Sequence, residues 1–223
     1  MGTILASAIF AGCAELMEDD SNVTYLAADF LRWLNEGQRA VCIVQPEAYA
    51  VRGIITLTAG GVRHTASDSD VRAILEVYRN TNSGGTNAGR AVIQCDRQTL
   101  DEYNPNWQSV DATTEIKNWW IDERDPTTFW SYPPAHGSTP CYVEALLAKT
   151  PADVAAIGDA ITLDDIYQPA LTEWVMHRFT GRDSEDTPNV QRSQMHLQKF
   201  VTLVTGDASN LKTVSAKLRD QIK

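Results

Sequence analysis

Three carboxylates lie within four residues of the sequence, in the stretch WIDERDPTTFWSYPP at 120–134. Asp122, Glu123 and Asp125 surround Arg124, and such a cluster could supply a general acid and base or bind a metal ion. The residues on both sides have the aromatic and β-branched composition of strands, and an Asp-Pro pair favours a turn because Asp bonds its own backbone while Pro fixes φ. A general acid needs desolvation to raise its pKa, which a hairpin tip does not provide. The sequence therefore favours a turn over a chemical site, with a contact to a partner protein as the alternative.

A second candidate is the pair Glu173 and His177, which are four residues apart on an expected helix, with His196 on the next helix. Such spacing can hold a metal ion. However, the H-E-x-x-H pairing is missing, and Glu173 and His177 lie off the apolar stripe of their helix. We therefore expect polar surface or interface residues and no metal ligand.

Other signatures of catalysis are missing from the sequence. There is no G-x-S-x-G, and the glycine-rich GGTNAGR at 84–90 lacks the Lys-Ser/Thr of a phosphate-binding loop. The four cysteines are widely spaced without a C-x-x-C pair, so we expect reduced thiols. The sequence predicts no catalytic, cofactor-binding or metal-binding residue, and the protein is not expected to be an enzyme.

Aromatic side chains gather on two expected strands, and some of them must lie outside the core because successive strand residues face opposite sides of a sheet. Trp and Tyr are enriched at protein interfaces. We take Trp119, Trp130 and Tyr132 as interface candidates. The same three residues could instead form a carbohydrate- or peptide-binding platform.

The protein has 223 residues, 43% of them hydrophobic, and a formal net charge of −10. Attraction to nucleic acid needs clustered Lys and Arg, so we do not expect the protein to bind DNA by bulk charge. No basic n-region precedes the first apolar stretch, and no apolar run approaches the roughly 18 residues of a membrane span. We expect no signal peptide and no membrane association.

The hydrophobic period predicts helices at both ends of the chain and strands in the middle. We expect helices over 3–17 and 23–44, about six short strands between 50 and 148, and three helices after 160, with Gly206 ending the second of these. The predicted class is α+β. A helical bundle formed by both chain ends carries an inserted small antiparallel β-sandwich or barrel. The expected divisions are 1–48, N-terminal helices; 49–150, the β module; 151–206, C-terminal helices; and 207–223, a C-terminal arm.

The arm would extend about 25 Å as a helix at about 1.5 Å per residue. It combines a narrow apolar stripe with basic residues, although the chain as a whole is acidic. Such a segment fits an acidic or grooved partner. The alternative is a solvated, frayed terminus.

The order of several stretches resembles a family of tailed-phage and prophage head-to-tail adaptor proteins, over about residues 4 to 205. These stretches are FLRWLNEGQRAV, QPEAYA, ITLTAGG, ILEVYRN, GRAVIQCDRQTLDEYNPNW, IDERDPTTFWSYPP and LDDIYQPALTEWVMHRF. Members of that family also place a D-x-x-D/N-P turn before an aromatic strand that ends in Pro-Pro.

The resemblance implies a structural connector in the neck of a virion, assembled in the host cytoplasm. It implies a ring of twelve identical subunits below the portal protein, which extends the DNA channel and docks tail, tail-tube or nozzle proteins. DNA would pass through without sequence-specific binding, and no cofactor is implied. By analogy with related connectors, the arm would contact the portal through an apolar set and a basic set: Leu211, Val214, Leu218 and Ile222; Lys212, Lys217 and Arg219.

Overall fold

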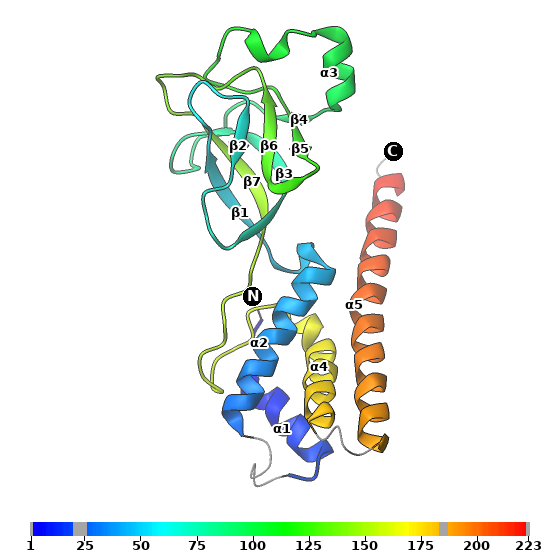
Figure 1. Ribbon diagram of the computed structural model, residues 1–223. Coiled ribbons are helices and arrows are strands. Elements are labelled where there is room, and N and C mark those ends of the chain that lie inside the picture. The colour runs from blue at the N-terminus through cyan, green and yellow to red at the C-terminus, as the bar shows by residue number, and fades with distance from the viewer. Residues whose placement is uncertain (1, 20–25, 183–186, 222–223) are drawn as a thin grey trace. The chain divides into compact units, whose positions relative to one another are not determined.

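The computed structural model describes residues 2–19, 26–182 and 187–221, with side chains in the last range described from 188 to 206. The chain divides into two compact units, which we call the helical unit (Met1–Ala48 with Pro151–Lys223) and the β unit (Tyr49–Thr150). The four longest helices fall into the helical unit and both sheets into the β unit (Figure 1). This arrangement confirms the predicted α+β class.

Within its described residues, the helical unit is built on four α-helices and two short 3-10 turns. Their bounds are α1 Ala6–Leu16, α2 Ala27–Val44, η1 Pro46–Tyr49, η3 Asp165–Tyr167, α4 Gln168–Gly181 and α5 Thr187–Gln221. In α2 the residues Phe30, Leu34 and Val41 are buried, as their 3- and 4-residue spacing predicts. Phe10 of α1 packs on Phe30, with ring centroids 4.8 Å apart.

Two expectations for the helices were wrong. The helical spacing of Leu5, Ile9, Cys13 and Leu16 predicts one buried face for α1. Of these four, only Ile9 and Cys13 are buried, whereas Leu5 and Leu16 are exposed. The second error concerns Gly206, because α5 continues through this residue to Gln221 without a break. A glycine inside a helix costs only about 1 kcal/mol relative to alanine, which is too little by itself to end the helix.

Buried amides of α2 hold the segment that follows the β unit in the chain. Asn35 accepts the Val154 N–H through Oδ1 (2.8 Å) and donates from Nδ2 to the Val154 carbonyl (3.1 Å). Gln38 Oε1 accepts the N–H groups of Thr162 (2.8 Å) and Leu163 (3.2 Å). These bonds satisfy backbone groups that would otherwise be buried without a partner.

The β unit contains two open sheets, with strand orders β1-β7-β3 and β2-β6-β5-β4. The β4–β5 pair is parallel and all the other strand pairs are antiparallel. The strands are β1 Ala50–Thr56, β2 Arg63–Thr65, β3 Val71–Thr81, β4 Ile93–Gln94, β5 Asn118–Asp122, β6 Asp125–Tyr132 and β7 Tyr142–Lys149. Neither described sheet closes into a barrel, so of the two predicted alternatives the sandwich is correct.

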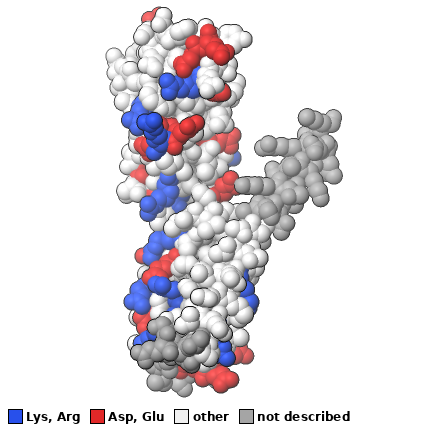
Figure 2. Space-filling model, turned by 45° about the vertical axis from the view of Figure 1, so that its right-hand side comes forward, with Lys and Arg blue, Asp and Glu red and all other residues white. Residues whose placement is uncertain are grey.

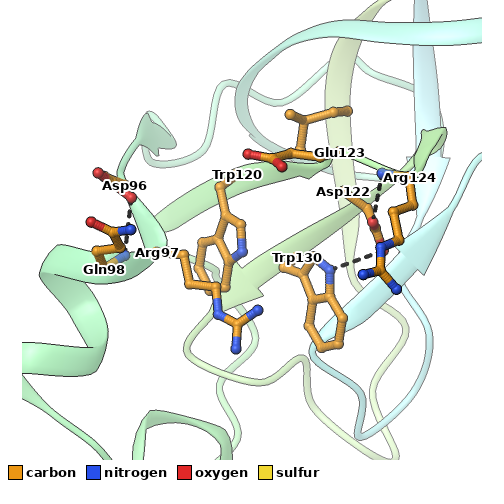
Figure 3. Close-up of a pocket in the computed structure, with 9 residues that line it drawn as sticks. Asp96, Arg97, Gln98, Trp120, Asp122, Glu123, Arg124 and Trp130 are labelled. Carbon is orange, nitrogen blue, oxygen red and sulfur yellow. Dashed lines mark hydrogen bonds between the residues drawn. The ribbon is translucent and has the colours of Figure 1, made fainter.

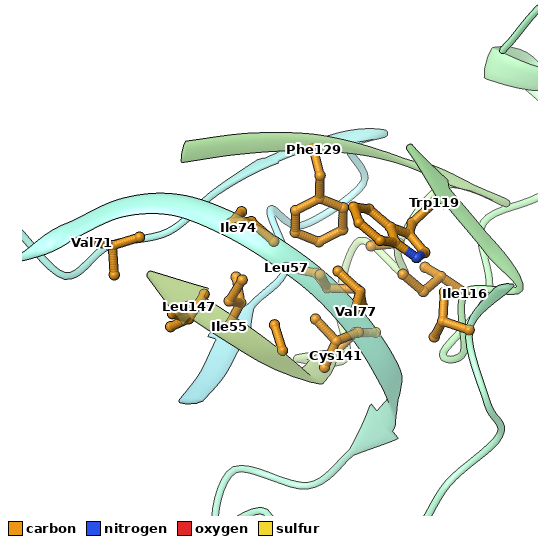
Figure 4. Packing of buried hydrophobic residues seen from close by; sticks show 14 residues of the cluster. Ile55, Leu57, Val71, Ile74, Val77, Ile116, Trp119, Phe129, Cys141 and Leu147 are labelled. Carbon is orange, nitrogen blue, oxygen red and sulfur yellow. The ribbon is translucent and has the colours of Figure 1, made fainter. Parts of the chain in front are cut away.

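One hydrophobic cluster fills the space between these sheets. Val77 and Leu147 come from the first sheet, whereas Trp119 and Phe129 come from the second (Figure 4). All four are almost completely buried. The sandwich therefore has a core to which every strand of five or more residues contributes at least one buried side chain.

Strand β2 and two short helical elements, α3 (Arg97–Tyr103) and η2 (Trp107–Ser109), were not predicted from the sequence. Asp96 begins α3, because its Oδ1 accepts the Gln98 N–H at 3.0 Å. Trp107 is anchored by its Nε1–H, which donates to Asp101 Oδ1 at 2.7 Å. The segment from 96 to 109 therefore contains ordered helical turns that are held by side-chain hydrogen bonds.

Candidate partner-binding sites

The carboxylates of the β5–β6 hairpin form the turn that the sequence predicts. Asp122 Oδ1 accepts the Arg124 N–H at 3.1 Å. Asp125 Oδ1 accepts the N–H of Thr127 (3.1 Å) and its hydroxyl (2.7 Å), and Asp125 Oδ2 accepts the Thr128 hydroxyl (2.7 Å). The prediction of a turn is therefore confirmed.

The electrostatics of this turn do not suit acid catalysis. Hydrogen bonds from Thr127 and Thr128 hold the pKa of Asp125 below its usual value, whereas a general acid needs a raised pKa. Arg63 lies 3.7 Å from Asp125, which further favours the charged form of that carboxyl. Among the residues that the structure describes, no group of three or more His, Cys, Asp or Glu could hold a metal ion.

Neighbouring tryptophans of β5 face opposite sides of the second sheet. Trp119 points into the core and is 2% exposed, so its prediction as an interface residue was wrong. Trp120 points outward and pairs across the strands with Trp130. Trp107 packs edge-on against both indoles, with centroid distances of 4.8 Å to Trp120 and 6.3 Å to Trp130. Trp107 therefore covers the outer face of this sheet.

Beside these indoles lies a shallow pocket of about 520 Å³, which we call the indole pocket (Figure 3). Asp122 Oδ2 accepts the Trp130 Nε1–H at 3.3 Å, which fixes one wall. Arg97 pairs with Asp101 at 3.3 Å, while Arg124 has an exposed side chain. Trp and Arg are the residue types that contribute most at protein interfaces. The lining residues are Asp96, Arg97, Gln98, Trp120, Ile121, Asp122, Glu123, Arg124 and Trp130.

The three sequence candidates do not form one platform. Trp130 and Tyr132 are half-buried on the outer face of β6, where alternate residues share one side. Trp119 lies on the other side, inside the sandwich. A glycan platform that uses all three is therefore incompatible with this fold. Trp107 was not predicted as part of this surface, and the N-cap Asp96 ahead of α3 was the local signal for its segment.

The histidine candidates connect α4 and α5 to each other. His196 Nδ1 lies 2.6 Å from Glu173 Oε2, and His177 Nδ1 lies 2.8 Å from Ser193 Oγ. Glu173 and His196 thus approach one another, but His177 is bonded to a serine. Both contacts are partly buried, so these residues join two helices of the unit.

His64 was not singled out from the sequence, although it forms a bonded chain with Ser131 in the β unit. His64 Nδ1 accepts the Thr58 N–H at 2.9 Å, so Nε2 carries the proton and donates to Ser131 Oγ, also at 2.9 Å. Ser131 in turn donates to the Pro133 carbonyl at 3.3 Å. Burial lowers the pKa of His64 from 6.5 to about 4. A protonated Nε2 cannot accept the serine proton, so this pair is structural and not a nucleophile with its base.

The arm candidates lie outside the described side chains. The backbone of α5 is helical as far as Gln221, and α5 runs back along α4 and continues past the beginning of α4 (Figure 1). The affected candidates are Leu211, Lys212, Val214, Lys217, Leu218 and Arg219. Ile222 lies beyond the described residues altogether. Their contacts with a portal protein remain a prediction.

Basic and acidic side chains are interspersed on the face of the molecule that Figure 2 shows, and the described residues of this face form no large patch of a single charge. Ion pairs account for part of this pattern, such as Arg178 with Glu36 at 2.7 Å. Among the described residues, no helix combines the length and apolar content needed to cross a bilayer.

A family model described as SU10 adaptor protein matches residues 6–219 of the chain. The match includes both units and extends into the arm. No curated protein matches the chain.

Proposed function

The chain belongs to the SU10 adaptor protein family, and from this we propose that it forms a ring below the portal, extends the DNA channel and docks tail proteins. Membership confirms the resemblance to phage head-to-tail adaptors and makes the chain a phage adaptor that contacts other head and tail proteins. The observation that carries the proposal is the extent of the match, which covers both units. In detail, we propose a ring of twelve copies that lies in the virion neck and contacts the portal.

The charge of the chain supports a role as a conduit. A channel wall must let DNA slide, and clustered Lys and Arg would bind phosphates and release their counterions. With a net charge of −10, the subunit favours repulsion over such pairing. An acidic ring can therefore surround DNA without holding it.

Ring formation requires a neighbour interface on the order of 800 Å² on each subunit. The helical unit has exposed apolar side chains that could contribute to such a surface. They are Leu16, Ile43, Ile166, Met195 and Val201. A head-to-tail interface closes into a ring when its rotation fits the number of copies.

The arm is the proposed contact to the portal. In the sequence, Leu211, Val214 and Leu218 recur at helical spacing, and Lys212 and Lys217 supply positive charge. An apolar stripe on a helix can enter a groove, and the basic residues would bind an acidic rim. α5 extends this segment in continuous helical form from the helical unit.

Electron microscopy of the protein mixed with its portal tests the ring directly. We expect twelve-fold rings on the portal, and a portal that stays bare would refute the proposed position. A truncation that removes 207–223 should abolish portal binding.

Two double variants distinguish the loss of the apolar stripe of the arm from a change in its net charge. Leu211→Asp with Leu218→Asp should abolish binding, whereas Ser209→Asp with Thr213→Asp adds the same charge outside the apolar spacing and should retain it. Truncated protein that still joins heads to tails normally would refute the role of the arm.

A further inference from the structure

Strand β1 is an open sheet edge at the side of the β1-β7-β3 sheet. Leu57 N–H donates to the Cys141 carbonyl at 2.9 Å, which sets the hydrogen-bonded pairs of the β1–β7 ladder at odd-numbered residues of β1. The N–H and C=O groups of Arg52, Ile54 and Thr56 therefore point away from β7. In the part of the chain that the structure describes, none of these groups bonds to another residue. The next residue of the series, Thr58, uses its outward N–H to bind His64.

The other edges of the β unit are protected. Strands β2 and β4 have three and two residues. The edge of β3 is partly paired, because Asn80 N–H donates to the Arg90 carbonyl (2.8 Å) and Val92 N–H to the Tyr78 carbonyl (2.9 Å), and β3 also bulges against β7. Short strands and bulges are common protections of sheet edges. β1 has seven residues, no proline and no bulge.

We propose that β1 receives an extended segment of another virion protein as an additional strand of this sheet. This inference rests on the proposed function, since it supplies the β unit with a docking site for a partner. Backbone hydrogen bonds would give such a complex its affinity, and alternate side chains would give it specificity. Among the described residues of this chain, the extended N-terminal residues pair with the segment around Ala160, and the segment after β7 is bonded to α2. These segments are already engaged, so we infer a different protein as the donor.

The two faces of β1 define the chemistry of the incoming segment. On the core side Ile55 is buried and Val51 is 38% exposed, so an apolar residue of the guest strand would extend the sandwich core over Val51. On the other side the Arg52 side chain is 68% exposed and has one carboxylate, Glu144, at 3.7 Å. A carboxylate on the guest can bind there. The fitting segment is free of proline at paired positions, apolar on one side and acidic on the other.

Hydrogen exchange provides the first test, comparing free protein with virions that contain it. We expect the amides of Arg52, Ile54 and Thr56 to exchange freely in the isolated protein and at least about 100-fold more slowly in the virion. Unchanged exchange in the virion would overturn the inference while the proposed function stands. Virions that lack the chain by mass spectrometry would instead overturn the proposed function. If these amides exchange slowly in the isolated protein and the protein forms dimers as its concentration rises, β1 pairs with β1 of a second copy. That result would also overturn the inference that a different protein donates the strand.

A variant pair provides the second test. Ile54→Pro removes an outward N–H and leaves the ladder to β7 intact, because proline is tolerated where an edge N–H faces solvent. Ile54→Ala removes the same side chain and keeps the N–H. After circular dichroism shows that both are folded, we expect Ile54→Pro to reduce the yield of tailed particles roughly tenfold or more and Ile54→Ala to change it little. Equal yields for the two variants would refute strand addition.

Discussion

The buried imidazole of His64 should make the stability of the β unit depend on pH. Folding places the ring among apolar groups, with Thr58 N–H donating to Nδ1, so a second proton has neither solvent nor an acceptor. Burial thus lowers the pKa from 6.5 to about 4. Between pH 6.5 and about 4, His64 binds a proton in the unfolded chain but stays neutral in the folded chain. The free energy of unfolding therefore falls as pH falls through this window and has its full value above 6.5.

The size of this effect follows from the two pKa values. Each pKa unit corresponds to about 1.4 kcal/mol, so the contribution lost between pH 6.5 and about 4 is about 3 kcal/mol. Domains of ordinary stability have about 5–15 kcal/mol in total. The decrease in the free energy of unfolding that His64 alone causes at low pH should therefore be measurable.

Urea unfolding followed by tryptophan fluorescence, at pH values from above 6.5 down to about 4, is the assay. In His64→Asn the amide oxygen can still accept the Thr58 N–H, but the proton-binding group is gone. The stability difference between wild type and this variant should shrink by about 3 kcal/mol across the window. Carboxylates that titrate in the same range cancel in this comparison.

Ser131→Ala is the matched control, because it removes the partner of Nε2 and keeps the imidazole. It should lower stability by about 1–3 kcal/mol at every pH in the window, and it should retain the pH dependence of the wild type. A wild-type pH dependence in His64→Asn would refute the assignment to His64.

Three further substitutions test packing, two in the helical unit and one in the β unit. Gly37→Ala should destabilise the helical unit by about 1–3 kcal/mol, because a Cβ there would stand 2.8 Å from Trp174 Cδ1, whereas Gly12→Ala meets no atom within 4 Å and should stabilise α1 by up to about 1 kcal/mol. Thermal unfolding measures both, and equal shifts would contradict the packing around Gly37. Trp107→Ala should cost about 3–5 kcal/mol in urea unfolding, because it removes the cover of Trp120. A loss below about 1 kcal/mol would show that Trp107 is not an essential cover.

Patterns of short range were readable from the sequence. The spacing of Phe30, Leu34 and Val41 predicts the buried face of α2, because a helix brings residues three and four apart together. The Asp-Pro pair predicts the β5–β6 turn for an equally local reason. The change of hydrophobic period predicts an α+β protein, and the order of motifs along the chain identifies the adaptor family.

Contacts between distant segments were decided by the tertiary structure. Sequence alternation required Trp119 and Trp120 to face opposite sides, but only the packing of the two sheets put Trp119 inside and Trp107 over Trp120. Gly206 looked like a helix end, yet its small local cost did not stop α5. The open edge of β1 and the buried His64 also depend on strand order, which no local pattern encodes, because hydrogen-bond partners in a sheet come from residues far apart in the chain.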